Sequence, residues 1–277
     1  MNERLQVLLD KYKPSKLGIH STGNCYESTA YYVKQFEEWQ QCGFSWFKLL
    51  VAGDSGVNTV REMRKHNLPI IPVIRFWFGD HSYPSATLSP DQIKPYVDAW
   101  GEPLLFETQN EFYAGSEYAG NMPSNWPDLI AHEWAVMTNA IINGGGIPCT
   151  PAIEGWNYDR IFVPLWNILT GVGGYRALVE QSVVAGHWRT LNHPPASYMK
   201  DPGGYMGWQW VDKYIQNTLG HSLPLLGTEA GPEPGWNQDK TFPSVTPESH
   251  KDMCLEIIRM EKPDYYLGDC FWLWEGS

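Results

Sequence analysis

The feature that most constrains the fold of this chain is a regular alternation of short runs rich in β-branched and aromatic residues with longer segments of helical pattern. Eight such runs occur, and the starts of consecutive runs lie 25 to 43 residues apart, which leaves room for a strand, a helix and two loops. The runs are Lys16–His20, Phe44–Ala52, Pro69–Phe76, Leu104–Asn110, Ile147–Ala152, His187–Asn192, Leu223–Glu229 and Tyr265–Trp272. Strands that alternate with helices in this way indicate parallel βα units.

The segments between the runs carry the start and stop signals of helices. Ser89 precedes a proline at a first helical position, and the glycines at 144–146 form a natural C-cap. Residues 156–186 give no clear assignment, because three glycines within them break any long helix. Helices are predicted over Ser28–Cys42, Ser55–His66, Asp91–Trp100, Pro127–Asn143 and Pro247–Lys262.

Eight βα units predict a closed (β/α)₈ TIM barrel that occupies residues 1–277 as a single domain, a fold that typically takes about 250 residues. An open doubly wound sheet would need a glycine-rich phosphate loop after the first strand, and residues 20–24 read His-Ser-Thr-Gly-Asn instead. The chain stops at Ser277, directly after the eighth run, so the eighth helix is expected to be missing. We expect an extra helix over Asn2–Lys11 to cover the barrel near that gap.

Charge and cysteine content exclude several classes of protein. With 20 Lys and Arg against 31 Asp and Glu, the net charge is −11, which opposes binding to nucleic acid or to an anionic membrane. No apolar run is long enough to predict a membrane span, and the amino terminus lacks a signal peptide. We therefore expect a cytoplasmic protein, or a secreted domain without its leader, that is a monomer. The five cysteines lack zinc or redox spacing, which predicts reduced thiols and no metal or other cofactor.

Two carboxylates stand where strands are predicted to end. Glu111 follows the fourth run, and Glu229 ends the seventh. Catalytic residues of such barrels lie at the carboxyl ends of the strands, so both side chains are expected at the mouth of the barrel. Cleavage of a glycosidic bond needs two facing carboxylates, of which one protonates the leaving oxygen and the other attacks or activates water. The alternative is that each acid merely caps the helix that follows it.

The pair Asn110-Glu111 together with Glu229 resembles glycoside hydrolase clan A, the "4/7" superfamily of retaining TIM-barrel glycosidases. The resemblance implies that Glu111 is the general acid/base, that Asn110 binds the sugar 2-hydroxyl and that Glu229 is the nucleophile. It also implies a β-linked substrate. Phe112 stands where the clan usually has proline, so no family within the clan is assigned. Glu233, in the loop after the seventh strand, is the main rival for the nucleophile role.

Four further strand ends supply candidate substrate-binding residues. His193 follows strand six, where the clan often places a His or Tyr that touches the nucleophile; the alternative is an ordinary loop histidine. Trp272 and Trp274 end strand eight, where the clan has a tryptophan under the central sugar. Because alternate strand residues point in opposite directions, only one of the two can face the mouth, and we favour Trp272. Trp77 and Glu154, at the ends of strands three and five, bind hydroxyls or sugar rings in this interpretation and are packing or capping residues in the alternative.

The 14 tryptophans favour the same class of ligand, because the C–H face of a sugar ring packs well on an aromatic ring, although a Trp-rich core is the competing explanation. The sequence thus predicts a retaining glycoside hydrolase that cleaves O-glycosidic bonds of a poly- or oligosaccharide by double displacement. The alternative is a non-catalytic carbohydrate-binding barrel module of a larger assembly. In the hydrolase, the pKa of Glu111 is expected above the ~4.3 of a free Glu, and the carboxyl groups are expected about 5–5.5 Å apart.

Overall fold

A computed structural model describes residues 2–20, 22–79, 87–113, 122–154, 158–197, 204–233 and 239–272. Within these residues, parallel strands form one sheet in the order β5-β4-β3-β2-β1-β9-β8-β7-β6. The strands are β1 (Leu17–His20), β2 (Trp46–Val51), β3 (Ile71–Phe76), β4 (Leu105–Glu107), β5 (Ile147–Pro148), β6 (Ile153–Glu154), β7 (Val184–Leu191), β8 (Leu225–Pro232) and β9 (Tyr266–Trp272).

The two ends of this strand order meet, because β5 and β6 are consecutive parts of one stretch of chain. Ile147 of β5 pairs with β4, and Ile153 of β6 pairs with β7. Between them, Cys149 forms a parallel bridge with Val183, and the Thr150 N–H donates to the Val183 carbonyl at 2.8 Å. The stretch therefore acts as the fifth of eight barrel strands, and the predicted (β/α)₈ barrel is confirmed.

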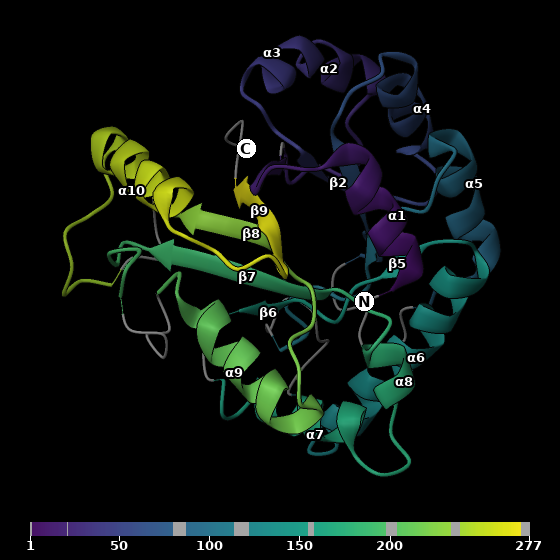
Figure 1. Cartoon of the computed structure of the whole chain (residues 1–277), viewed down its shortest axis with the longest axis vertical. Coiled ribbons are helices and arrows are strands. Elements are labelled where there is room, and N and C mark those ends of the chain that lie inside the picture. The colour runs from purple at the N-terminus through teal and green to yellow at the C-terminus, as the bar shows by residue number, and fades with distance from the viewer. Residues whose placement is uncertain are drawn as a thin grey trace.

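All eight predicted strands occur, with shifted ends. The fourth stops at Glu107 instead of Asn110, and the sixth, β7, begins at Val184, three residues before the predicted start. Helices surround the sheet (Figure 1). They are α1 (Glu3–Tyr12), α2 (Thr29–Val33), α3 (Phe36–Gln41), α4 (Val57–Lys65), α5 (Pro90–Trp100), α6 (Trp126–Asn143), α7 (Phe162–Thr170), α8 (Arg176–Val179), α9 (Gly207–Leu219) and α10 (Pro247–Arg259). The predicted helix over Ser28–Cys42 is divided into α2 and α3, and the unassigned stretch holds α7 and α8.

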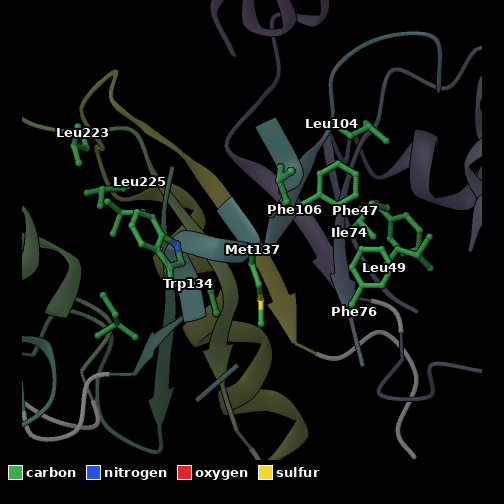
Figure 2. Close-up of a cluster of buried hydrophobic side chains, with 14 of the residues drawn as sticks. Phe47, Leu49, Ile74, Phe76, Leu104, Phe106, Trp134, Met137, Leu223 and Leu225 are labelled. Atoms are coloured by element: carbon green, nitrogen blue, oxygen red, sulfur yellow. The ribbon is translucent and has the colours of Figure 1, made fainter. Parts of the chain in front are cut away.

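Side chains alternate between the outside and the inside of the barrel along each strand. Phe47 and Leu49 of β2 point outward and join the core between the sheet and the helices, together with Ile74 and Phe76 of β3 (Figure 2). Trp46, the residue before Phe47, points to the opposite side and belongs to a second core with inward residues of the other strands. That second core is apolar and includes Ile71, Val73, Leu105, Ile147, Ala185 and Leu226.

Helix α1 closes this inner core. Leu5 and Leu8 are fully buried and pack with the inward residues of the strands. Arg4 fixes the helix by donating to the carbonyls of Ile142 and Gly146 at 3.0 and 2.9 Å, at the point where the chain enters β5. The extra helix expected over Asn2–Lys11 is present as α1, and its apolar face packs on the inner core of the barrel.

No helix within the described ranges is long and apolar enough to cross a membrane. The five cysteines are all free thiols.

Candidate active site

Above the apolar inner core, the last inward positions of the strands carry ionisable side chains. They are His20 of β1, Lys48 of β2, Arg75 of β3, Glu107 of β4, His187 and Arg189 of β7, and Glu229 of β8, and all but Arg189 are buried. The inward residues are thus apolar in the inner core and ionisable nearer the carboxyl ends of the strands. This layer lies at the carboxyl ends of the strands, the face where barrels of this kind carry their active sites.

Glu229 is the centre of the ionisable layer. Lys48 lies between two carboxylates, with its Nζ 2.9 Å from Glu229 Oε1 and 3.0 Å from Glu107 Oε1. Arg75 approaches both of these oxygens to 3.7 Å. Burial alone would raise the pKa of Glu229, but the charges of His187, Lys48, Arg189 and His20 outweigh it and hold the pKa well below its usual range. Glu229 is therefore ionised, as a nucleophile must be.

Glu111 faces Glu229 from the turn after β4. His187 Nδ1 lies 2.7 Å from Glu111 Oε1, and Arg189 Nη2 hydrogen-bonds to Glu111 and to Glu229 at once. One carboxylate oxygen of each Glu and one ring nitrogen of His187 all lie within 4.8 Å of one another. The two acids singled out by the sequence thus come together around a single guanidinium group.

The protonation of Glu111 differs from the expectation. Burial would raise its pKa, but Arg189 and the hydrogen bond and charge of His187 outweigh burial, so the pKa lies below its ordinary value. The sequence-based expectation of a raised pKa for Glu111 is therefore wrong. The physical reason is Arg189, a cation that sequence inspection did not place in the site.

Glu233 is a third carboxylate at the same guanidinium. It follows β8 directly, is half-buried, and places its Oε2 3.7 Å from Arg189 Nη1. Burial raises the pKa of Glu233; the charge of Arg189 opposes that rise, and the charges of Glu111 and Glu229 add to it. Glu233 therefore holds a proton more readily than an ordinary Glu.

The structure also locates the predicted Asn110 and tryptophans. Asn110 is half-buried beside Glu111 in the turn after β4. Trp272, the last residue of β9, meets His20 edge to face with ring centroids 4.5 Å apart, and Arg189 Cζ lies 5.7 Å from the Trp272 ring centre. Trp77 is half-buried directly after β3, where its backbone N–H donates to the Val51 carbonyl at 2.7 Å. Trp274 and the side chain of Glu154 lie outside the described residues.

His193 lies beyond the end of strand β7. Leu191 has a φ of 50°, a left-handed conformation that a leucine rarely adopts and that turns the chain away from the sheet. The His193 ring then stacks on Phe242 with centroids 4.0 Å apart, and its Nε2 lies 3.3 Å from Asp239. The strand-six residues that contact the two carboxylates are His187 and Arg189. Sequence reasoning missed both because it examined the residues after the strand and not its inward positions.

Several other tryptophans pack against aromatic rings away from the two carboxylates. Trp126 lies against Phe112 with centroids 5.5 Å apart, and Trp208 lies against Tyr266 at 4.9 Å. Trp210 stacks on Tyr158 at 4.9 Å. The high tryptophan content is thus explained in part by the core, as the competing interpretation held.

Glu111, His187 and Glu229 have the donor atoms of a possible metal site within the described part of the chain. Lys48 and Arg189, however, already contact these carboxylates and balance their charge. A divalent ion would have to replace the Arg189 guanidinium and would meet Lys48 and Arg75 nearby. The donor set is therefore better suited to acid–base and nucleophilic chemistry by the carboxylates themselves.

No protein-family model matches the chain, and no curated protein sequence matches it. Among solved structures, the catalytic domain of a mannanase from Streptomyces sp. SirexAA-E is similar over 95% of this chain and 76% of its own length, with a TM-score of 0.50 and 12% sequence identity. At this sequence identity the similarity supports the barrel fold and nothing more specific.

Two further structures align over most of the chain. They are 3-keto-D-glucoside 4-epimerase from E. coli (TM-score 0.47, 9% identity, 92% of this chain and 90% of that one) and a family 51 α-L-arabinofuranosidase from Bifidobacterium longum (TM-score 0.45, 11% identity, 93% and 61%). At these TM-scores the similarity supports no further inference about this chain.

Proposed function

We propose that this protein is a retaining glycoside hydrolase that cleaves β-linked O-glycosidic bonds in a poly- or oligosaccharide. The observation that carries the proposal is the meeting of Glu111 and Glu229 at the barrel mouth, with an oxygen of each within 4.8 Å. A retaining mechanism needs carboxyl groups about 5–5.5 Å apart, whereas an inverting one needs roughly 6.5–9.5 Å to admit a water molecule. The short separation favours the retaining pathway.

In the proposed mechanism, Glu229 is the nucleophile. Its low pKa keeps it ionised, and Lys48 and Arg75 fix one of its oxygens from below. The other oxygen attacks the anomeric carbon while Glu111 donates a proton to the departing oxygen. Glu111 then removes a proton from the water that hydrolyses the glycosyl-enzyme. In this mechanism Trp272 packs against the sugar ring, and Asn110 binds the sugar 2-hydroxyl.

One observation favours the alternative of a carbohydrate-binding barrel without catalysis. Arg189 bridges the two carboxylates and lowers the pKa of Glu111, which favours the ionised form of a group that a hydrolase needs protonated. A binding module would need no change in this arrangement. A hydrolase needs Arg189 to leave the space between the carboxylates before the proton can be taken up.

A panel of dinitrophenyl and nitrophenyl β-glycosides distinguishes the two functions. We expect release of the chromophore from at least one sugar, and loss of turnover in Glu229→Gln by several orders of magnitude. The stereochemistry of the first product, followed by NMR, should be β. Binding to polysaccharides without release of chromophore from any member of the panel would favour the binding module, and an α product would contradict the retaining mechanism.

A further inference from the structure

Arg189 occupies the space that a sugar needs. Its Nη2 contacts Glu111 on one side and Glu229 on the other, and its Cζ lies 5.7 Å from the Trp272 ring centre. In the proposed reaction, the anomeric carbon lies between the same two carboxylates, and the sugar ring lies against the same tryptophan. The guanidinium and the substrate therefore exclude each other.

Glu233 offers Arg189 a second position. Its Oε2 is 3.7 Å from Arg189 Nη1, beyond hydrogen-bond distance, and this buried oxygen has no hydrogen-bond partner within the described residues. The Glu233 N–H donates to the Leu191 carbonyl at 3.1 Å, so its backbone is fixed next to the strand that carries Arg189. A small rotation of the guanidinium would shorten this 3.7 Å ion pair into a hydrogen-bonded one.

The remaining cations permit such a movement. Glu229 keeps Lys48 at 2.9 Å and Arg75 at 3.7 Å when Arg189 leaves, so it stays ionised. Glu111 has fewer counter-charges, since the ionisable groups that face it are Arg189 and His187 of β7, Glu229 of β8 and Glu233. Loss of Arg189 therefore changes Glu111 far more than it changes Glu229.

We propose, on the basis of the hydrolase function above, that Glu233 is a positioning residue which draws Arg189 out of the gap between Glu111 and Glu229 as a sugar enters. Once Arg189 pairs with Glu233, burial and the nearby charge of Glu229 favour protonation of Glu111. The proton is taken from solvent and is later given to the leaving oxygen. The acid is thus prepared only when the site is occupied, and Arg189 returns when the product leaves.

The first test needs no catalysis. In Glu111→Gln/Glu229→Gln, the two side chains that hold Arg189 in the gap lose their charge, so Arg189 should pair with Glu233. The loss of two like charges and this pairing should together lower the pKa of Glu233 by about one unit or more. Carboxyl ¹³C NMR of the labelled chain measures this pKa. Adding Arg189→Met to the same background removes the pairing alone and should raise the pKa of Glu233 again. A Glu233 pKa that stays high in the double variant overturns the proposal.

The second test is a double-mutant cycle on the best aryl glycoside of the panel. Glu233→Gln removes the carboxylate toward which Arg189 is proposed to move. The sugar must then displace Arg189 from Glu111 and Glu229 without that carboxylate, so KM should rise about tenfold or more. In an Arg189→Met background the gap is already open, and Glu233→Gln should change KM less than twofold. The exposed Glu248→Gln is the matched control and should leave kinetics unchanged.

The two tests separate this inference from the proposed function. If Glu233→Gln raises KM equally in both backgrounds, Glu233 acts independently of Arg189 and the inference is wrong while hydrolysis stands. If no glycoside is hydrolysed but the Glu233 pKa falls as expected in the double variant, the hydrolase function is wrong, while the movement of Arg189 to Glu233 stands as a feature of a binding site. Circular dichroism and thermal unfolding verify that each variant is folded.

Discussion

At the scale of single residues, the proposed role of Glu111 predicts a dependence on the leaving group. Glu111→Ala should lower turnover of substrates with poor leaving groups by about 10²–10⁴-fold, the usual contribution of a general acid. Dinitrophenyl glycosides, which need little protonation, should lose much less. Azide should restore activity and give a β-glycosyl azide, which is measured by NMR of the product. An equal loss on both kinds of substrate without rescue would assign Glu111 another role.

Lys48 links Glu229, the proposed nucleophile, to a deeper carboxylate, Glu107. Because Lys48 lowers the pKa of Glu229, Lys48→Met should raise it, and the acidic limb of the kcat/KM profile should move to higher pH. The substitution also breaks a buried ion pair, which costs about 3–5 kcal/mol of unfolding free energy. Replacing Glu107 by Gln in the same chain should recover part of that loss, because it removes the second uncompensated charge.

The control for Lys48 is Lys94, whose exposed ion pair with Asp98 measures 2.9 Å. Surface pairs of this kind contribute about 0–1 kcal/mol, so Lys94→Met should leave stability and the pH profile nearly unchanged. An acidic limb that does not move in Lys48→Met would show that Lys48 supports the fold without setting the charge of Glu229.

At the scale of elements, the floor helix α1 gives a direct test of the barrel core. Leu8 is fully buried within the inner core, whereas its neighbour Val7 is exposed. Leu8→Ala should lower the unfolding free energy by about 2–5 kcal/mol, and Val7→Ala should change it by less than about 0.5 kcal/mol. Urea unfolding measures both. Similar values for the two variants would mean that α1 does not close the barrel.

The elements also explain which parts of the site could be predicted from sequence. Glu111 and Glu229 were found because each follows an apolar run, and strand ends are visible without knowing the pairing of strands. Lys48 lies inside β2, all of whose residues are buried, so hydrophobicity does not reveal which of its residues face inward. A lysine in a fully buried strand was nevertheless a signal, since lysine is seldom buried without a partner.

Arg189 and His187 required tertiary information. The sequence placed the start of strand six at His187, and the strand begins at Val184. The turn at Leu191, where φ is 50°, carries the following residues toward Phe242 and Asp239. The sequence does not predict this turn, because the position holds neither proline nor glycine. His193 was therefore chosen by its place in the chain, while the contacts with the carboxylates come from earlier, inward positions.

At the scale of the whole molecule, the ionisable layer predicts how stability depends on pH. Glu107, Glu111 and Glu229 all have pKa values below their ordinary range in the folded protein, since cations outweigh the effect of burial. A carboxyl group of this kind stabilises the fold at pH values above its unfolded pKa of about 4.3, and this stabilisation is lost as the pH falls through the folded value. The unfolding free energy should therefore decrease below about pH 4.5.

Asp269 of β9 acts in the opposite direction. It is buried with Tyr205, Tyr266 and Lys262, and burial raises its pKa although all three neighbours donate to it or carry positive charge. The folded protein therefore binds a proton at Asp269 more tightly than the unfolded chain does. As the pH falls through the raised pKa, protonation of Asp269 increases the unfolding free energy. This single group offsets only part of the unfolding free energy that is lost when the three glutamates are protonated.

Glu107→Gln isolates the contribution of the ionisable layer to acid unfolding. At pH 7 the variant should be less stable than the parent by about 3–5 kcal/mol, because Lys48 loses one of its two buried partners. As the pH falls below about 4.3, the unfolded parent takes up a proton at Glu107 more readily than the folded parent does, so the difference between the two proteins should shrink. The exposed Glu38→Gln should follow the parent at every pH. Urea unfolding at a series of pH values measures all three, and a stability difference that is constant between pH 7 and pH 3 would mean that the charge of Glu107 does not couple folding to protonation.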